Sequence, residues 1–198
     1  RGLESYWSVP AGEKTAVNGH WRKGPGMDFL ERIKGWFKGI EIIAEDLGIL
    51  TDEVRRLLKE SGFPGMKVLE FAFDNSRTSD YLPYKYDKNC VCYAGTHDNA
   101  TLKEWKETGD KAEIAFAKEY FGITGRSSFN FGIIKGGMAS TADLFITQMQ
   151  DYLELGKEAR TNVPGVADGN WKWRMKKGAA TDKLAEKIAH ITEMYGRA

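Results

Sequence analysis

Short apolar runs alternate with amphipathic segments along this chain. Four runs are short and apolar enough to be buried strands: 40–44, 66–73, 90–94 and 142–148. Apolar residues recur at helical spacing over 28–38, 51–62, 100–107, 110–121, 127–138 and 181–195. Strands that lack an alternating polar face are typical of parallel sheets, which helices cover on both sides. The pattern therefore predicts an α/β fold, either an open sheet between two helical layers or a (β/α) barrel.

Local signals refine several of these elements. Thr51 has the character of an N-cap, acidic residues follow it in the first turn, and Gly62 ends that helix. Residues 3–26 are rich in glycine and aromatic residues and contain two prolines, so we expect a long structured loop there. Four aromatic residues fall on helical stripes and are expected in the core: Trp36, Phe37, Phe116 and Phe121.

Composition excludes several classes of protein. The 198 residues carry 29 Lys and Arg against 28 Asp and Glu, and this balance argues against a strongly basic nucleic-acid surface. No apolar run approaches the roughly 20 residues of a membrane span. Aromatic residues make up 12% of the chain, too many for a disordered segment. Cys90 and Cys92 would point to opposite faces of a strand, so they read as buried thiols.

Acidic side chains follow three of the predicted strands. Reactive groups of (β/α) barrels project from the carboxyl ends of strands. Desolvating a carboxylate costs free energy, so packing alone would not place acidic residues there. Glu45 and Asp46 follow the first strand, and His97 and Asp98 follow the third. Each pair also has a structural interpretation. Glu45 and Asp46 could begin a polar loop in which Asp46 caps a helix, and His97 and Asp98 could form a structural hydrogen-bonded pair. Asp151, after the fourth strand, is interpreted as an N-cap. Two carboxylates on different strand ends suit glycoside chemistry.

A second group of aromatic residues lies in polar, loop-like surroundings. Flat rings beside polar groups are the surfaces on which sugar faces stack, although tryptophan is also common in structured loops. This composition favours a sugar-binding surface only modestly. The residues concerned are Trp7, Trp21, Tyr81, Tyr84, Trp171 and Trp173.

Several ordered motifs carry a more specific resemblance. They are residues 23–26 (KGPG), 42–48 (IIAEDLG), 62–73 (GFPGMKVLEFAF), 95–99 (GTHDN), 159–165 (ARTNVPG) and 169–174 (GNWKWR). Together they resemble the 4-α-glucanotransferases, also called amylomaltases or disproportionating enzymes, of glycoside hydrolase family 77. The similarity runs over about residues 1–175, in order and with the spacing of that family.

This resemblance implies the C-terminal half of a (β/α)8 TIM barrel, about strands 5–8 with their helices, over residues 1–198. Residues 1–27 would form the loop after a missing fourth strand, and the N-terminal half would be absent. The family's nucleophile is an Asp in an Asp-His-Phe-Arg-Gly motif, so it would lie three residues before Arg1. The resemblance thus implies a retaining transglycosylase that transfers α-1,4-glucan segments between maltooligosaccharides. It implies that the enzyme is cytoplasmic and that the present chain is a fragment of it, inactive alone. It implies no metal, no organic cofactor, no nucleic acid and no membrane partner.

The resemblance also assigns roles to individual residues. Glu45 matches the general acid/base, and Asp98 matches the carboxylate that stabilises the transition state. His97 matches a ligand of a sugar hydroxyl, while Phe71 and Asn162 match positions that line the substrate groove.

The chain departs from the family pattern at five positions, which affects subsite contacts rather than the two carboxylates: Glu70, Tyr84, Lys85, Ala100 and Val166. Three alternatives stay open at this stage. The chain could be a non-catalytic glucan-binding module, a self-associating half-barrel with open sheet edges, or a piece of an α-amylase-type hydrolase.

Overall fold

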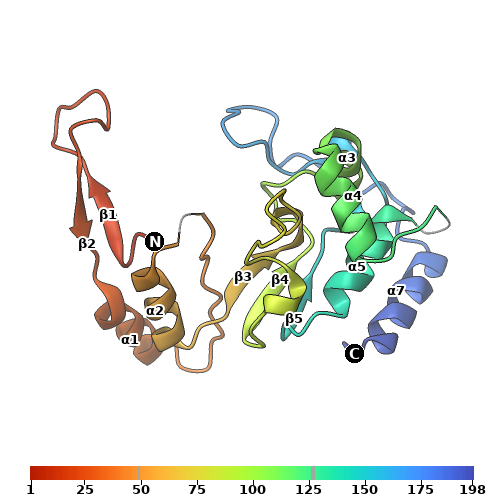
Figure 1. The fold of residues 1–198 in the computed structure, drawn as a ribbon, viewed down its shortest axis with the longest axis horizontal. Coiled ribbons are helices and arrows are strands. Elements are labelled where there is room, and N and C mark those ends of the chain that lie inside the picture. Colours follow the sequence, from red (N-terminus) through yellow and green to blue (C-terminus); the bar gives the residue numbers. More distant parts are fainter. Residues whose placement is uncertain (49, 126–127) are drawn as a thin grey trace. The chain divides into compact units, whose positions relative to one another are not determined.

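The chain forms two units, residues 1–66 and 67–198, in the computed structural model, which describes residues 1–48, 50–125 and 128–198 (Figure 1). The first unit contains β1 (Ser5–Ser8), β2 (His20–Lys23), α1 (Gly26–Trp36) and α2 (Asp52–Ser61). Strand β3 (Gly65–Val68) runs across the boundary. The second unit continues with β4 (Cys90–Tyr93), α3 (Leu102–Thr108), α4 (Lys111–Tyr120), α5 (Phe129–Met138), β5 (Leu144–Ile146), α6 (Met149–Tyr152) and α7 (Asp182–Met194). Three short 3-10 helices complete it: Leu69–Phe71, Pro83–Lys85 and Lys157–Ala159.

Residues 3–26 differ from the expected loop because they contain an antiparallel hairpin. In this hairpin β1 pairs with β2, and Trp7 lies opposite Trp21. The two indole rings meet edge to face with centroids 5.3 Å apart, and the Trp7 Nε1–H donates to the carbonyl of Ala16. A cross-strand aromatic pair of this kind stabilises a hairpin. The glycines and prolines around the two strands indicated a loop, and each strand is too short to show a clear alternation of apolar and polar residues.

The KGPG motif (residues 23–26) has a structural role in the first unit. The Gly24 N–H donates to the carbonyl of Glu4, and the Gly26 N–H donates to that of Leu3. A Cβ atom on Gly24 would lie 2.4 Å from the Leu3 carbonyl oxygen, so only glycine fits this close approach. The motif therefore fastens the start of α1 to residues 3–4.

Helix α2 confirms the predicted boundaries. Thr51 is its N-cap and accepts from the Val54 N–H, and Gly62 ends it in the left-handed region at φ 68°. Helix α1 packs against α2 and buries Leu30. The expectation that Trp36 and Phe37 are core residues is wrong, since they are 69% and 50% exposed. Trp36 is the last residue of α1 and Phe37 is its C-cap, so both lie at the end of the helix, beyond the part that packs through Leu30.

The strand predicted over 40–44 is absent. These residues are described without regular secondary structure, and one backbone hydrogen bond ties them to a neighbouring segment, from the Ala44 N–H to the carbonyl of Pro64. In a parallel ladder the return donor would be the Met66 N–H, which instead donates to the Asp46 Oδ1, so the ladder does not continue at this point. The β-branched run predicted a buried strand, but Ile40 and Ile43 are exposed.

The second unit is built on a three-stranded sheet in the order β3–β4–β5. The predicted parallel pairing is confirmed for β4 and β5, where Val91 lies opposite Leu144. Figure 1 shows α3, α4, α5 and α7 gathered beside this sheet. The predicted strand 66–73 stops at Val68 because the chain turns into a 3-10 helix, and the predicted strand 142–148 is reduced to β5.

The core of the second unit lies between the sheet and these helices. It includes Phe73 at the centre of an aromatic cluster with Trp105, Phe116, Tyr120 and Phe121. Phe116 and Phe121, expected in the core, are partly buried and pack against it. Cys90 and Cys92 are buried free thiols, as predicted, and burial raises the pKa of Cys92 to about 12.

The predicted helices of this unit are present with capping residues at their starts. Side chains of Thr101, Asp110, Ser128 and Thr181 accept from backbone N–H groups of α3, α4, α5 and α7. Ser127, where one helix was predicted to begin, lies outside the described residues.

Candidate functional site

The loop after β4 presents the predicted His97 and Asp98. The Asn99 Oδ1 accepts from the Thr96 N–H at 2.9 Å and from the Thr96 Oγ1 hydroxyl at 2.7 Å. The Asp98 N–H donates to the Thr96 Oγ1 at 3.3 Å. This hydrogen-bonded turn fixes the loop while the side chains of His97 and Asp98 stay about half exposed, at 52% and 49%. Both are therefore available to a ligand.

A segment more than 60 residues later in the chain folds onto this loop. The Asn162 Nδ2 donates to the Asp98 Oδ1 at 2.5 Å, and the Asn162 N–H donates to the His97 carbonyl at 3.1 Å. The His97 Nε2 lies 3.4 Å from the same Asp98 Oδ1. Three residues predicted for the site are thus brought together. Their individual roles stay predictions.

Trp171 completes this cluster of polar groups with an aromatic face. Its ring centroid lies 4.9 Å from that of His97, and the side chain is largely exposed. The backbone of Trp171 is in the left-handed region at φ 61°, a conformation that costs energy in a bulky residue. The Trp171 N–H donates to the Thr161 carbonyl at 2.7 Å and holds it there. The sequence had indicated Trp171 only as one loop aromatic among six.

Arg160 lies in the motif 159–165, which predicted no role for it, and the structure places it at the same site. Its Nη2 donates to the Asp98 carbonyl at 2.8 Å, and its Nε donates to the Asn162 carbonyl at 2.9 Å. Its Nη1 lies 3.6 Å from the Oε1 of Glu104 on α3. The position in a recurring motif was the only sequence signal, because its partners are distant in the chain.

Two buried carboxyl groups lie beneath the loop. Burial raises the pKa of Glu70 well above its usual value, the Asp151 charge adds to the rise, and a hydrogen bond from Asn99 opposes it. The Glu70 Oε1 is buried and has no hydrogen-bond partner in the described part of the chain. A Cβ on Gly95 would lie 2.6 Å from this oxygen, so a larger residue there would force the Glu70 carboxyl to move. Glu70 thus supports the loop from below.

The N-cap interpretation of Asp151 is wrong. Asp151 lies inside α6, is 1% exposed, and its Oδ1 accepts from the N–H of Leu102 at 2.8 Å. It therefore satisfies the first turn of α3, not its own helix. Burial raises its pKa to about 6, against an opposing effect of the Leu102 hydrogen bond.

Glu45, the predicted acid/base, lies in the first unit. Its side chain is exposed, beside a cavity of about 70 Å³ that Leu30, Val54 and Phe63 also line. The neighbouring Asp46 is buried, and its Oδ1 accepts from the Met66 N–H at 2.6 Å. Asp46 thus has a structural role, but not the helix cap of the structural interpretation, since it bonds β3 and Thr51 caps α2. It anchors the segment from which Glu45 projects.

Phe71 is not part of the cluster around Asp98. Its ring packs edge to face against Tyr81 at 5.6 Å and remains partly exposed. Its proposed place in a substrate groove stays a prediction.

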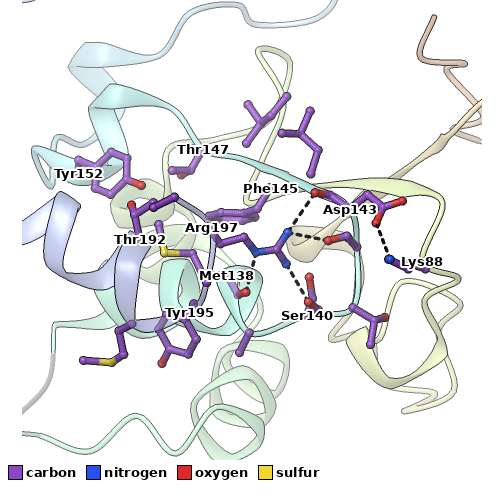
Figure 2. Close-up of a pocket in the computed structure, with 18 residues that line it drawn as sticks. Lys88, Met138, Ser140, Asp143, Phe145, Thr147, Tyr152, Thr192, Tyr195 and Arg197 are labelled. Carbon is purple, nitrogen blue, oxygen red and sulfur yellow. Dashed lines mark hydrogen bonds and ion pairs between the residues drawn. The ribbon is translucent and has the colours of Figure 1, made fainter. Parts of the chain in front are cut away.

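A larger cavity of about 1000 Å³ lies elsewhere in the second unit, beside β5 and the end of α7, and contains none of the predicted site residues. Figure 2 shows the guanidinium of Arg197 at its centre. Arg197 donates to the carbonyl of Met138, the last residue of α5, and to those of Ser140, Ala142 and Asp143, which follow it. This arrangement is a clamp on the connection to β5 rather than a reactive site.

Residues 1–48, 50–125 and 128–198 lack two features that would point to other kinds of function. No three His, Cys, Asp or Glu side chains there are grouped as metal ligands. No described helix is both long and apolar enough to cross a membrane.

Comparisons with known proteins agree with the motifs. A profile described as 4-alpha-glucanotransferase matches residues 1–181. The 4-alpha-glucanotransferase of Clostridium butyricum is 51% identical over 198 residues, covering 100% of this chain and 41% of that protein. The Thermus thermophilus 4-alpha-glucanotransferase is 40% identical over 204 residues, again with 100% and 41% covered. The chain thus spans about two fifths of the length of these relatives.

Solved structures give the same result for the fold. An amylomaltase from Streptococcus agalactiae, in complex with acarbose, matches with a TM-score of 0.92 and 34% identity, over 100% of this chain and 40% of that one. The amylomaltase of Corynebacterium glutamicum matches with a TM-score of 0.72 at 17% identity, over 96% and 34%, which supports the fold alone. The mixed α/β architecture is that of part of an amylomaltase.

Proposed function

The chain belongs to the 4-alpha-glucanotransferase family, and from this premise we propose that it carries two of the reactive carboxyl groups of a retaining transglycosylase acting on α-1,4-glucans. We further propose that residues 1–198 are the C-terminal half of a (β/α)8 barrel, with the site at the carboxyl ends of its strands. The parallel pairing of β4 and β5, with Asp98 just after β4, supports this placement.

In the proposed mechanism Glu45 is the general acid/base. Its carboxylic acid protonates the glycosidic oxygen while a carboxylate nucleophile attacks the anomeric carbon, which gives a covalent glycosyl-enzyme and releases the leaving glucan. The Glu45 carboxylate then takes the proton from the 4-hydroxyl of an acceptor sugar, which displaces the nucleophile. Exposure of Glu45 beside buried Asp46 supports this role, because both sugars must reach it.

The observation that carries the proposal is the cluster around Asp98. A half-exposed carboxylate, an imidazole, a carboxamide and an exposed indole converge from three separate segments. Sugars are bound by such a combination, since the polar groups bond hydroxyls and the flat ring covers a sugar face. Asp98 would lie against the positive charge that develops on the anomeric carbon in the oxocarbenium-like transition state.

Trp171 is proposed to form the apolar wall of this site. The strain of its backbone supports a role in ligand binding, because strained residues concentrate at such sites. A bound sugar, rather than water, at the acceptor position would favour transfer over hydrolysis.

We expect the 198 residues alone to be inactive on glucans. The Clostridium butyricum relative is about two and a half times as long as the region that these residues match. The nucleophile would come from the remainder of such a protein.

The test is a chimera in which these 198 residues replace the matching residues of the Clostridium butyricum relative, whose 51% identity should keep the fold. With maltotriose we expect glucose and longer maltodextrins from the chimera, and neither from the 198-residue chain. An inactive chimera with the thermal unfolding of its parent would contradict the proposed function. Disproportionation by the 198-residue chain alone would contradict the expected need for another nucleophile.

A second candidate, self-association of the half-barrel, rests on β5. It ends the sheet order β3–β4–β5, and Leu144 and Ile146 are exposed on it. Exposed strand edges invite pairing with another strand. Sedimentation of the 198-residue chain tests this candidate: a concentration-dependent dimer supports it, and a monomer at all concentrations contradicts it.

A further inference from the structure

Three segments of the second unit meet at the guanidinium of Arg160. The Nη2 donates to the Asp98 carbonyl at 2.8 Å and the Nε donates to the Asn162 carbonyl at 2.9 Å. The third contact is the ion pair with Glu104 on α3, at 3.6 Å. Both charged side chains are largely buried, at 21% and 8% exposure. The Arg160 guanidinium is therefore paired with helix α3 through Glu104 and bonded to two backbone carbonyls of the site.

Helix α3, which carries Glu104, is itself held in place at its start. Helix α3 begins at Leu102, whose N–H is held by the buried Asp151, and the Thr101 side chain caps the Glu104 N–H at 3.2 Å. The hydrogen bonds of Arg160 go to the backbone carbonyls of Asp98 and Asn162. The side chains of these two residues bond each other. A single side chain thus links a rigid helix to both members of the pair.

We propose that Arg160 is a positioning residue, which sets the orientation of the Asp98 carboxylate and the Asn162 carboxamide toward a sugar. A planar guanidinium offers donors in fixed directions, and so it can hold two carbonyls at one separation. Lysine can keep the charge beside Glu104 but cannot hold both carbonyls in this geometry. The importance of this role for catalysis rests on the proposed function, whereas the positioning itself does not.

A purely structural role of Arg160 would have a different signature. Glu104 is buried, and its Oε2 has no hydrogen-bond partner in the described part of the chain. Without Arg160 its charge would be left uncompensated, which destabilises a fold. Converting Glu104 to Gln at the same time removes that charge. The double variant Arg160→Gln/Glu104→Gln therefore separates stability from positioning.

The experiment follows the side-chain amide protons of Asn162 by NMR in the 15N-labelled 198-residue chain. In the unmodified chain the hydrogen bond to Asp98 slows their exchange with water. In Arg160→Lys and in the double variant we expect exchange roughly 10-fold faster, the effect of losing about one hydrogen bond, with thermal stability near that of the parent. Arg77→Lys, at an exposed ion pair with Glu119, is the matched control and should change nothing.

Two results would overturn the proposal. One is exchange of the Asn162 amide protons in Arg160→Lys as slow as in the unmodified chain. The other is a double variant in which both this slow exchange and the thermal stability equal those of the unmodified chain. The readout needs no catalysis, so an inactive chimera contradicts the proposed function and leaves this inference standing. In an active chimera, Arg160→Lys should lower kcat for maltotriose more than it raises KM. An unchanged kcat there, with fast Asn162 exchange, would contradict the catalytic role of Asp98 and not the positioning by Arg160.

Discussion

In residues 67–198 apolar side chains converge on one core, whereas in residues 1–66 several large aromatic side chains remain exposed. The fully buried large side chains, such as Phe73, Leu82 and Leu102, belong to the second unit. Correspondingly, Asp98 is held by several hydrogen bonds, while Glu45 extends from a segment without regular secondary structure. The comparison teaches that one candidate carboxylate is prearranged by its own unit, and that the other is positioned mainly by its buried neighbour, Asp46.

The largest difference is expected when the same side chain is truncated in both units. Leu102→Ala in the second unit should lower the free energy of unfolding by about 3–5 kcal/mol, and Leu30→Ala in the first by about 2 kcal/mol. Leu102 is fully buried, and the cavity it leaves cannot collapse as easily as one near the surface. Hydrogen exchange measured separately for peptides of each unit would check this. Equal losses of protection would break the comparison.

The second prediction concerns the buried Asp151. Its pKa rises from 3.8 unfolded to about 6 folded, so between these values the folded chain holds a proton that the unfolded chain releases. Stability should therefore fall as pH rises from about 4 to about 6 and stay lower above it. Asp151→Asn keeps an acceptor for the Leu102 N–H and should remove the part of this dependence that Asp151 causes, with a gain of about 2–3 kcal/mol above pH 7. Glu70, whose pKa burial also raises, should keep its own contribution.

Urea unfolding of Asp151→Asn from pH 4 to pH 8 is the measurement. Asp87→Asn, at an exposed position of the same unit, is the control and should follow the unmodified chain. A loss of stability in Asp151→Asn at pH 8 would show that the carboxylate stabilises the fold as an anion.

A smaller effect is expected at the C-terminal end of the second unit. Arg197→Lys loses the geometry that serves four carbonyls, and unfolding free energy should fall by about 1–2 kcal/mol. Figure 2 shows why one ammonium group cannot reach all of them. Thermal unfolding beside the Arg77→Lys control, expected within about 0.5 kcal/mol of the parent, checks this. Equal stability of the two variants would mean that the clamp contributes nothing.

The smallest effect is predicted for the hairpin of the first unit. A double-mutant cycle of Trp7→Leu and Trp21→Leu should give a coupling of about 0.5–1 kcal/mol from their cross-strand contact. Zero coupling by thermal unfolding would show that this pair does not stabilise the hairpin.

The sequence predicted the second unit better than the first for a physical reason. Periodicity identifies which face of an element is apolar, and where a core covers that face the prediction is correct, as for α4 with Phe116. It does not show what covers the face. Trp36 and Phe37 occupy an apolar stripe that stays exposed. The run 40–44 has the composition of a strand, but the Met66 N–H that would extend its pairing donates to Asp46 instead.

Within the site, the motifs located His97, Asp98 and Asn162, and the structure brings them together. The supporting residues could not be predicted because their partners are remote in sequence. Asp151 serves a helix that begins 49 residues earlier, and Arg160 joins Asp98 across 62 residues. No local pattern encodes such pairs, since a carboxylate that caps its own helix and one that caps a distant helix have the same surroundings in the sequence.

The most direct test of the assigned carboxylates is the initial rate of glucose release from maltotriose by variants of the chimera. Glu45→Gln should reduce the rate by about 100- to 10,000-fold, as expected for loss of a general acid/base, and Asp98→Asn should also abolish most of the activity. Glu41→Gln and Asp87→Asn, at exposed positions nearby in sequence, should retain the rate of the unmodified chimera. A Glu45→Gln chimera that releases glucose at the unmodified rate would contradict the account.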